Sequence, residues 1–145
     1  YLIEHGHKTV ALLAGVRSYL SNQERTAGFL QAFQEEGLSI PPELILETGS
    51  WLYDAAEKVC LNFFNTYTGE MPTALFAFND RLATGAINAI CKTGRTVPDD
   101  VSVIGYDNLG YYNIISPRIT TVETHAYDMA AKQRQLSACK SPYPS

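Results

Sequence analysis

Several polar and aromatic residues follow directly after apolar runs of the sequence, and their chemical types suit a small polyhydroxylated ligand. These residues are Ser21, Arg25, Trp51, Asn79 and Asp107. A guanidinium group presents a planar fork of donors, a carboxylate accepts from two neighbouring hydroxyls, and an amide does both. The face of an indole ring can cover the apolar face of a sugar. Together these types favour the binding of a sugar-like molecule.

Each of these residues also has a purely structural interpretation. The sole role of Asn79, or of Asp80 after it, could be to cap a helix. The sole role of Asp107 could be to form a turn. Arg25 could pair with a neighbouring glutamate on the surface, where an ion pair contributes little. Trp51 could be a core aromatic. No single residue decides between the two interpretations, so the hypothesis of a binding site depends on the fold bringing them together.

Alternating apolar runs and helical patterns predict the elements that position these residues. The runs predict strands at 9–14, 44–48, 73–78, 101–106 and 119–122. Apolar residues at helical spacing predict helices within 23–37, around 56–63 and from about 80 to 94, and a further helix start near 126. Strands that alternate with helices indicate βαβ units and a doubly wound parallel α/β sheet. The carboxyl ends of its strands, where ligands bind in such sheets, would gather the candidate residues.

Motifs of other chemistries are missing from the sequence. No Gly-x-Gly-x-x-Gly follows a strand, and neither a Walker lysine nor a Gly-x-Ser-x-Gly elbow is present. His5 and His7 could hold a metal ion, but no third ligand lies near them and the end of a helix explains them better. His125 has no other histidine near it in the sequence. We therefore predict a binding protein without catalytic activity, metal or cofactor.

Composition limits the function classes further. The chain has 145 residues, of which 46% are hydrophobic and 18% charged, which suits one domain with a buried core. A net charge of −4 without a cluster of basic residues argues against direct binding of nucleic acid by this chain. No apolar run approaches the roughly 20 residues that cross a bilayer. Cys60, Cys91 and Cys139 lack metal or redox spacing, which favours a reducing compartment and predicts a cytoplasmic protein.

Several motifs in register resemble the sugar-responsive LacI/GalR transcriptional regulators. The most specific is Val-Pro-Asp-Asp-Val-Ser-Val-Ile-Gly-Tyr-Asp-Asn at 97–108. Pro-Thr-Ala-Leu-Phe-Ala-Phe-Asn-Asp at 72–80 and Ser-Pro-Arg-Ile-Thr-Thr-Val at 116–122 resemble further motifs of the family. Residues 2–11 and 25–29 fit the same template in the same order, and the match extends to about residue 131.

This resemblance implies one part of a larger regulator, which has a helix-turn-helix domain, a hinge and a core of two subdomains. Residues 9–122 resemble the C-terminal effector-binding subdomain, a three-layer αβα unit with the flavodoxin-like strand order 2-1-3-4-5. Residues 1–8 would end a helix from an absent N-terminal subdomain. Residues 123–145 would begin a crossover helix and continue as a loose tail.

The resemblance also implies partners. Arg25, Trp51, Asn79 and Asp107 would contact a small-molecule effector, a sugar or sugar derivative, that drives closure of the two subdomains. A homodimer interface would include Leu82, Ala86, Ile114 and Ile115, although the two isoleucines could equally be buried in the core. Operator DNA would bind through the absent N-terminal domain, and no membrane would be involved. The alternative is a periplasmic-type sugar-binding protein of a transport system, which has the same fold and crevice.

Overall fold

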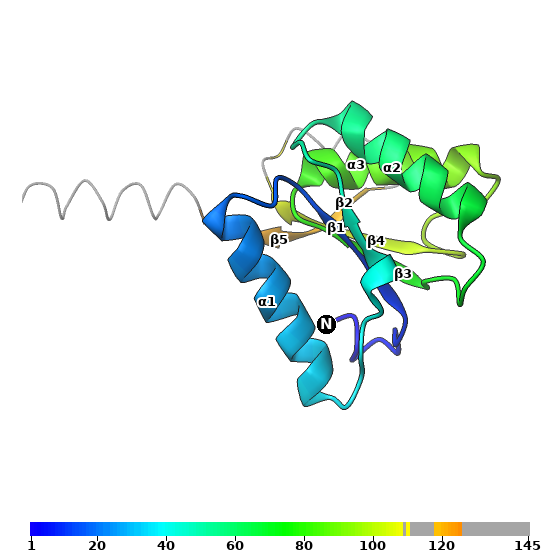
Figure 1. Ribbon diagram of the computed structural model, residues 1–145. Coiled ribbons are helices and arrows are strands. Elements are labelled where there is room, and N and C mark those ends of the chain that lie inside the picture. Colours follow the sequence, from blue (N-terminus) through cyan, green and yellow to red (C-terminus); the bar gives the residue numbers. More distant parts are fainter. Residues whose placement is uncertain (109, 111–117, 126–145) are drawn as a thin grey trace, which may run out of the picture.

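The computed structural model describes residues 1–108, 110 and 118–125, and these form a single α/β sheet with its helices (Figure 1). The elements are β1 (Val10–Ala14), α1 (Leu20–Glu35), a 3₁₀ turn η1 (Pro42–Leu44), β2 (Ile45–Glu47), α2 (Tyr53–Thr66), β3 (Ala74–Ala77), α3 (Asp80–Lys92), β4 (Ser102–Asp107) and β5 (Thr120–Glu123). The predicted alternation of strands and helices is confirmed. The predicted helix start near residue 126 lies outside the described residues.

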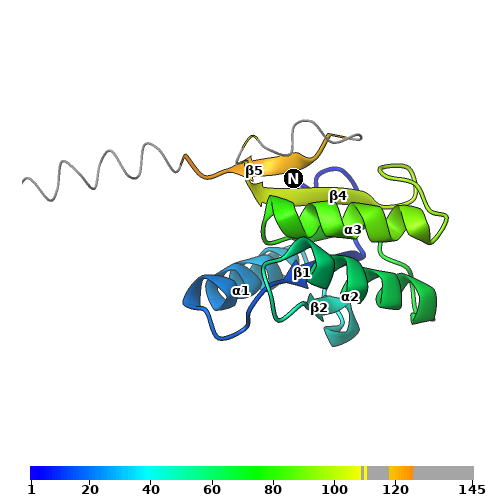
Figure 2. The same cartoon turned by 90° about the horizontal axis from the view of Figure 1, so that it is seen from above.

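All neighbouring strands pair in parallel in the order β2-β1-β3-β4-β5, as predicted. Figure 2 shows β5 and β2 at the two edges of the sheet. The five residues of β1 are buried because this strand lies inside the sheet with both faces covered. The order brings the carboxyl ends of β1, β3 and β4 side by side.

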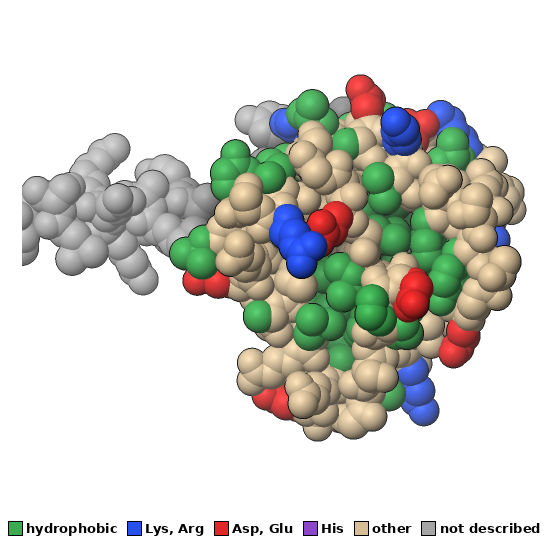
Figure 3. Space-filling model, viewed as in Figure 1, with side chains coloured by type: hydrophobic (Ala, Val, Ile, Leu, Met, Phe, Trp, Pro, Cys, Tyr) green, Lys and Arg blue, Asp and Glu red, His purple; other side chains and the backbone are tan. Residues whose placement is uncertain are grey.

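Helix α1 covers one face of the sheet, and α2 and α3 lie together on the other (Figures 1 and 2). Hydrophobic side chains remain visible between α1 and this pair of helices in Figure 3. None of the helices in the described part of the chain is long and apolar enough to cross a membrane.

Helix ends follow the glycine signals in the sequence. The backbone at Gly37 and Gly94 adopts positive φ angles of 70° and 79°, a conformation that favours glycine and ends a helix. Helix α1 begins at Leu20, three residues before its predicted start at Gln23. The N-cap residue Tyr19 makes no side-chain cap and Leu20 is 67% exposed, so neither a capping residue nor an apolar stripe marks this first turn.

The first residues of the chain form a turn rather than an assigned helix. His5 N–H donates to the carbonyl oxygen of Tyr1, and Gly6 N–H donates to that of Ile3. Leu2 and Ile3 are half-buried against the core. That residues 1–8 end a helix of another subdomain stays a prediction, as does the assignment of residues 9–122 to one subdomain.

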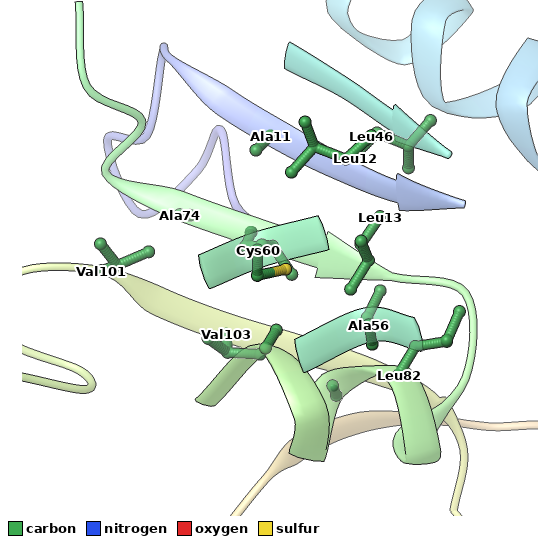
Figure 4. Close-up of a cluster of buried hydrophobic side chains, with 14 of the residues drawn as sticks. Ala11, Leu12, Leu13, Leu46, Ala56, Cys60, Ala74, Leu82, Val101 and Val103 are labelled. Atoms are coloured by element: carbon green, nitrogen blue, oxygen red, sulfur yellow. The ribbon is translucent and has the colours of Figure 1, made fainter. Parts of the chain in front are cut away.

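The core between the sheet and the α2–α3 layer also holds the residues of α3 that the resemblance assigned to a dimer interface. Leu82 and Ala86 have no exposed area, and Figure 4 shows Leu82 in one cluster with Ala56 and Cys60 of α2. Both side chains are therefore already packed in the core of this chain. A partner subunit on α3 would have to contact its exposed residues instead.

Two glycine-to-alanine substitutions should change stability in opposite directions. Gly28 is exposed in α1 with open space where a Cβ would stand, so G28A should raise the free energy of unfolding by about 0.5–1 kcal/mol. A Cβ on Gly85 would lie 2.5 Å from the carbonyl oxygen of Tyr53 and 2.8 Å from Cβ of Ala56. G85A should therefore separate α2 from α3 and cost about 1–3 kcal/mol. Urea unfolding measures both, and a neutral G85A would contradict this close helix contact.

Candidate functional site

The carboxyl ends of β3 and β4 meet the side chain of Arg25, which reaches them from α1. Its Nη1 donates to the carbonyl oxygen of Phe78 at 2.5 Å, and its Nη2 lies 4.0 Å from Oδ1 of Asp107. The guanidinium carbon lies 3.9 Å from the centre of the Tyr106 ring. Three different groups therefore fix Arg25, and it pairs across the fold with Asp107 instead of with a neighbouring glutamate.

Arg25 and Asp107 are only partly shielded from solvent. Their side chains are 28% and 27% exposed, so both retain a surface on which a ligand could bind. A planar guanidinium beside a carboxylate presents donors and acceptors together. This pairing makes the two residues the centre of the candidate site.

The backbone and surroundings of Asp107 are both unusual. Its φ is 106°, a region that few residues other than glycine adopt, although asparagine and aspartate tolerate it best. Burial raises the pKa of its carboxyl above the ordinary value, Asp80 raises it further, and Arg25 opposes both effects. The folded chain therefore disfavours the charged form of Asp107 relative to the unfolded chain, and groups with shifted pKa values occur often at functional sites.

Asp107→Asn should stabilise the unliganded domain at neutral pH. Because the folded-state pKa of Asp107 is raised, its contribution to stability is present below the ordinary pKa of 3.8 and is lost as the pH rises through the folded-state value. The free energy of unfolding of D107N should thus exceed that of the wild type at pH 7, and the two should converge below pH 3.8. Asp99→Asn, on an exposed residue, controls for the loss of one negative charge. An advantage of D107N that persists at low pH would contradict this account.

Asn79 is the N-cap of α3, so the capping interpretation is confirmed. Its Oδ1 accepts from the backbone N–H of Leu82 at 2.7 Å. Because the oxygen is engaged in the cap, the Nδ2 amide is the group that can donate to a ligand. Capping and ligand contact are therefore compatible for this residue.

Trp51 lies over the carboxyl end of β1. A Cβ on Gly15 would stand 2.4 Å from Cε3 of the indole, so only glycine permits the ring to lie there. Tyr19 stacks beside it, with ring centres 6.2 Å apart and planes inclined by 20°. Trp51 is half-buried against the core and keeps part of its ring in solvent. It is therefore neither a fully buried core residue nor a free surface one.

Ser21 is exposed in the first turn of α1, four residues before Arg25 and hence on the same face of the helix. Its neighbour Asn22 is 3% exposed, and Asn22 Oδ1 accepts from the N–H of Gly15 at 2.9 Å. This bond ties the start of α1 to the end of β1. The structure thus holds Ser21 at the same edge as Arg25 without placing it in the ion pair.

Three contacts of this edge were not predicted from the sequence: the Tyr106 ring under Arg25, the carbonyl oxygen of Phe78, and Tyr19 beside Trp51. Tyr106 directly precedes Asp107, so a search for aromatic residues beside the candidate charges would have found it. A carbonyl group leaves no signal in residue type.

The two histidines near the N-terminus lie at the amino ends of the strands, opposite the candidate site at their carboxyl ends. Nδ1 of His5 donates to the carbonyl oxygen of Tyr1 at 2.8 Å, and Nδ1 of His7 lies 2.9 Å from Oγ1 of Thr73. Both also line a cavity of about 300 Å³ together with Arg118, away from the candidate site. Among the described residues, no three potential metal ligands gather into one group.

Large apolar side chains are exposed around the candidate site. Tyr19, Leu20 and Leu52 are 54%, 67% and 55% exposed, and each lies at the N-terminal end of α1 or α2. These helix ends point to the carboxyl edge of the parallel sheet. Exposed apolar groups next to a polar pair are typical of a surface that another part of a protein covers.

Comparisons with known proteins agree with this arrangement. A family model described as a periplasmic binding protein-like domain matches residues 1–136. The chain belongs to this family. It is 38% identical over 132 residues to the HTH-type transcriptional repressor PurR of Pasteurella multocida, a match that covers 91% of this chain and 39% of the repressor. The chain thus spans less than half the length of this curated relative.

Solved structures of regulators have the same fold. A regulatory protein of the LacI family from Chloroflexus aggregans superposes with a TM-score of 0.88 at 28% identity, covering 95% of this chain and 49% of that one. The transcriptional regulator CelR in complex with cellobiose superposes with a TM-score of 0.85 at 27% identity, covering 94% and 41%. The chain therefore resembles the effector-binding domains of LacI-family regulators, which supports the regulator over the transport protein.

Proposed function

We propose that this chain is the effector-binding subdomain of a LacI-type transcriptional regulator, and that its effector is a sugar or sugar derivative. The Arg25–Asp107 pair at the carboxyl edge of the sheet is the observation that carries this proposal. Arg25, Trp51, Asn79, Asp107 and Ser21 would contact the effector. Binding rather than turnover is the function.

The chemistry of the site supports a polyhydroxylated ligand. Asp107 accepts from adjacent hydroxyls, Arg25 and the Asn79 amide donate, and the exposed part of the Trp51 indole packs on the apolar face of a pyranose ring. The complex of CelR with cellobiose gives a regulator of the same fold that binds a sugar. The five residues would therefore contact one face of the effector.

A second subdomain would contact the other face of the effector. The exposed side chains of Tyr19, Leu20 and Leu52 would lie near or in that contact. An effector that bridges both subdomains stabilises the closed arrangement, and the difference in its affinity for the two arrangements biases the DNA-binding domains of a homodimer. Such a regulator would act on operator DNA in the cytoplasm.

A ligand screen on the complete gene product tests this proposal. Monosaccharides, disaccharides, uronic acids and nucleosides are added singly, and the melting temperature is recorded for the wild type and for Asn79→Ala. At least one sugar should raise the melting temperature of the wild type, and the rise should shrink in N79A. The proposal fails if no compound of these classes stabilises the protein, or if the one that does acts equally on both variants.

A further inference from the structure

Asp80 is a buried acidic residue that the effector site does not use directly. It is the first residue of α3 and is 2% exposed. Its Oδ1 accepts from Oγ1 of Thr121, on β5, at 2.5 Å. A short bond of this kind is typical of a hydroxyl that donates to a charged carboxylate. The carboxylate thus connects the start of α3 to an edge strand of the sheet.

This connection passes directly over β4. Gly105 is the strand partner of Thr121, and a Cβ on Gly105 would stand 2.3 Å from Oδ1 of Asp80 and 3.2 Å from Cγ2 of Ile119. The carboxylate therefore occupies the space that any other residue at position 105 would fill. Two residues later the same strand ends at Asp107, one member of the candidate ion pair.

We propose that Asp80 is a positioning residue of the Arg25–Asp107 pair. Its bond to Thr121 holds β4 between α3 and β5, and this fixes the point from which the backbone turns at Asp107 towards Arg25. Among the residues that the structure describes, an ion pair, an electrostatic interaction and the strand register place three charged groups near Asp107: Arg25, Asp80 and Glu123. The effect on the pair is independent of the proposed function, whereas its consequence for ligand binding rests on that function.

Removing the donor tests the proposal with little change in shape. Thr121→Val keeps the volume of the side chain but deletes the hydroxyl, and Thr120→Val makes the same change at the exposed neighbour on β5. NMR of this chain follows the Arg25 guanidinium resonances and the titration of the Asp107 carboxyl. T121V should shift both and T120V neither. Thr121→Ser, which retains the donor, should restore the wild-type values.

Asp80→Asn gives an independent measurement. Because Asp80 raises the pKa of Asp107, removing its charge should lower the pH at which Asp107 titrates. If T121V lowers the melting temperature but leaves the Arg25 and Asp107 resonances unchanged, Asp80 only stabilises the fold and the proposal is wrong. A D80N variant in which the Arg25 resonances stay as in the wild type would also overturn it.

Ligand binding separates this inference from the proposed function. In the complete gene product, T121V should weaken the binding of a sugar found by the screen by about tenfold, because a displaced Asp107 makes poorer hydrogen-bond geometry with the ligand. T120V should leave the binding unchanged. If no sugar binds the wild type, the proposed function fails and the NMR measurement still decides the role of Asp80. If a sugar binds T121V and the wild type equally, the site does not depend on this positioning and the proposal is wrong.

Discussion

Arg25→Met should reduce effector binding about 30- to 5000-fold in the complete gene product. The substitution removes the bond to the Phe78 carbonyl, the contact with the Tyr106 ring and the partner of Asp107 in one step. In the proposed site Arg25 also donates directly to the effector, and truncating the charged partner of a buried contact at a binding interface typically costs about 2–5 kcal/mol, much of it because the group opposite is left unpaired. Isothermal titration with a sugar from the screen measures the loss.

Arg95→Met is the matched control for this prediction. Arg95 also lies against an aromatic ring, with its guanidinium carbon 5.6 Å from the centre of the Phe64 ring, and it donates to Thr93 at the far end of α3. R95M should bind the effector as the wild type does, and both variants should keep operator binding. If R25M retained wild-type affinity, the ion pair would have no part in recognition and the site would have to be sought elsewhere.

The candidate site could be predicted because a residue that directly follows a strand of a parallel sheet lies at a known end of that sheet. Residues that follow strands gather at one edge, and this argument collected Arg25 and Asp107 although 81 residues separate them in the chain. The partners that complete the environment of Arg25 could not be predicted in the same way. A backbone carbonyl such as that of Phe78 is present at every residue, and only the geometry of the fold selects one.

The fold could be predicted for a similar reason, and the errors of that prediction are confined to the ends of elements. The apolar run of β1 is buried on both faces, and Gly37 and Gly94 end their helices as expected. The start of α1 was placed late because its first turn carries neither a capping side chain nor an apolar stripe. Tertiary contacts decide such a boundary: Asn22 anchors that turn to Gly15 through a bond that no local pattern encodes.

The predicted dimer interface illustrates how little a resemblance alone says about the role of a single residue. A pattern of apolar residues on a helix does not say whether the neighbour that covers them belongs to the same chain. In this chain α2 and the sheet already cover Leu82 and Ala86. Ile114 and Ile115 lie outside the described residues, so their role in an interface stays a prediction, as does the homodimer.

Leu82→Ala should destabilise the isolated 145-residue chain by about 2–5 kcal/mol, the cost of removing a fully buried leucine and leaving a cavity. The side chain lies in the cluster between α3, α2 and the sheet (Figure 4), where neighbouring residues such as Ala56 are too small to fill the space. Urea unfolding at two protein concentrations measures the effect. A loss of this size lowers the ratio of folded to unfolded chain about 30- to 5000-fold.

Leu52→Ala is the control, because Leu52 is 55% exposed at the N-cap of α2 and its truncation should change stability by less than about 0.5 kcal/mol. The two possible roles of Leu82 differ in how its loss depends on concentration. A core residue costs the same stability at every protein concentration, whereas an interface residue costs stability only where the dimer forms. We expect no dependence on concentration for L82A. A loss that appears only at high concentration would return Leu82 to the interface and would require α3 to separate from α2 in the dimer.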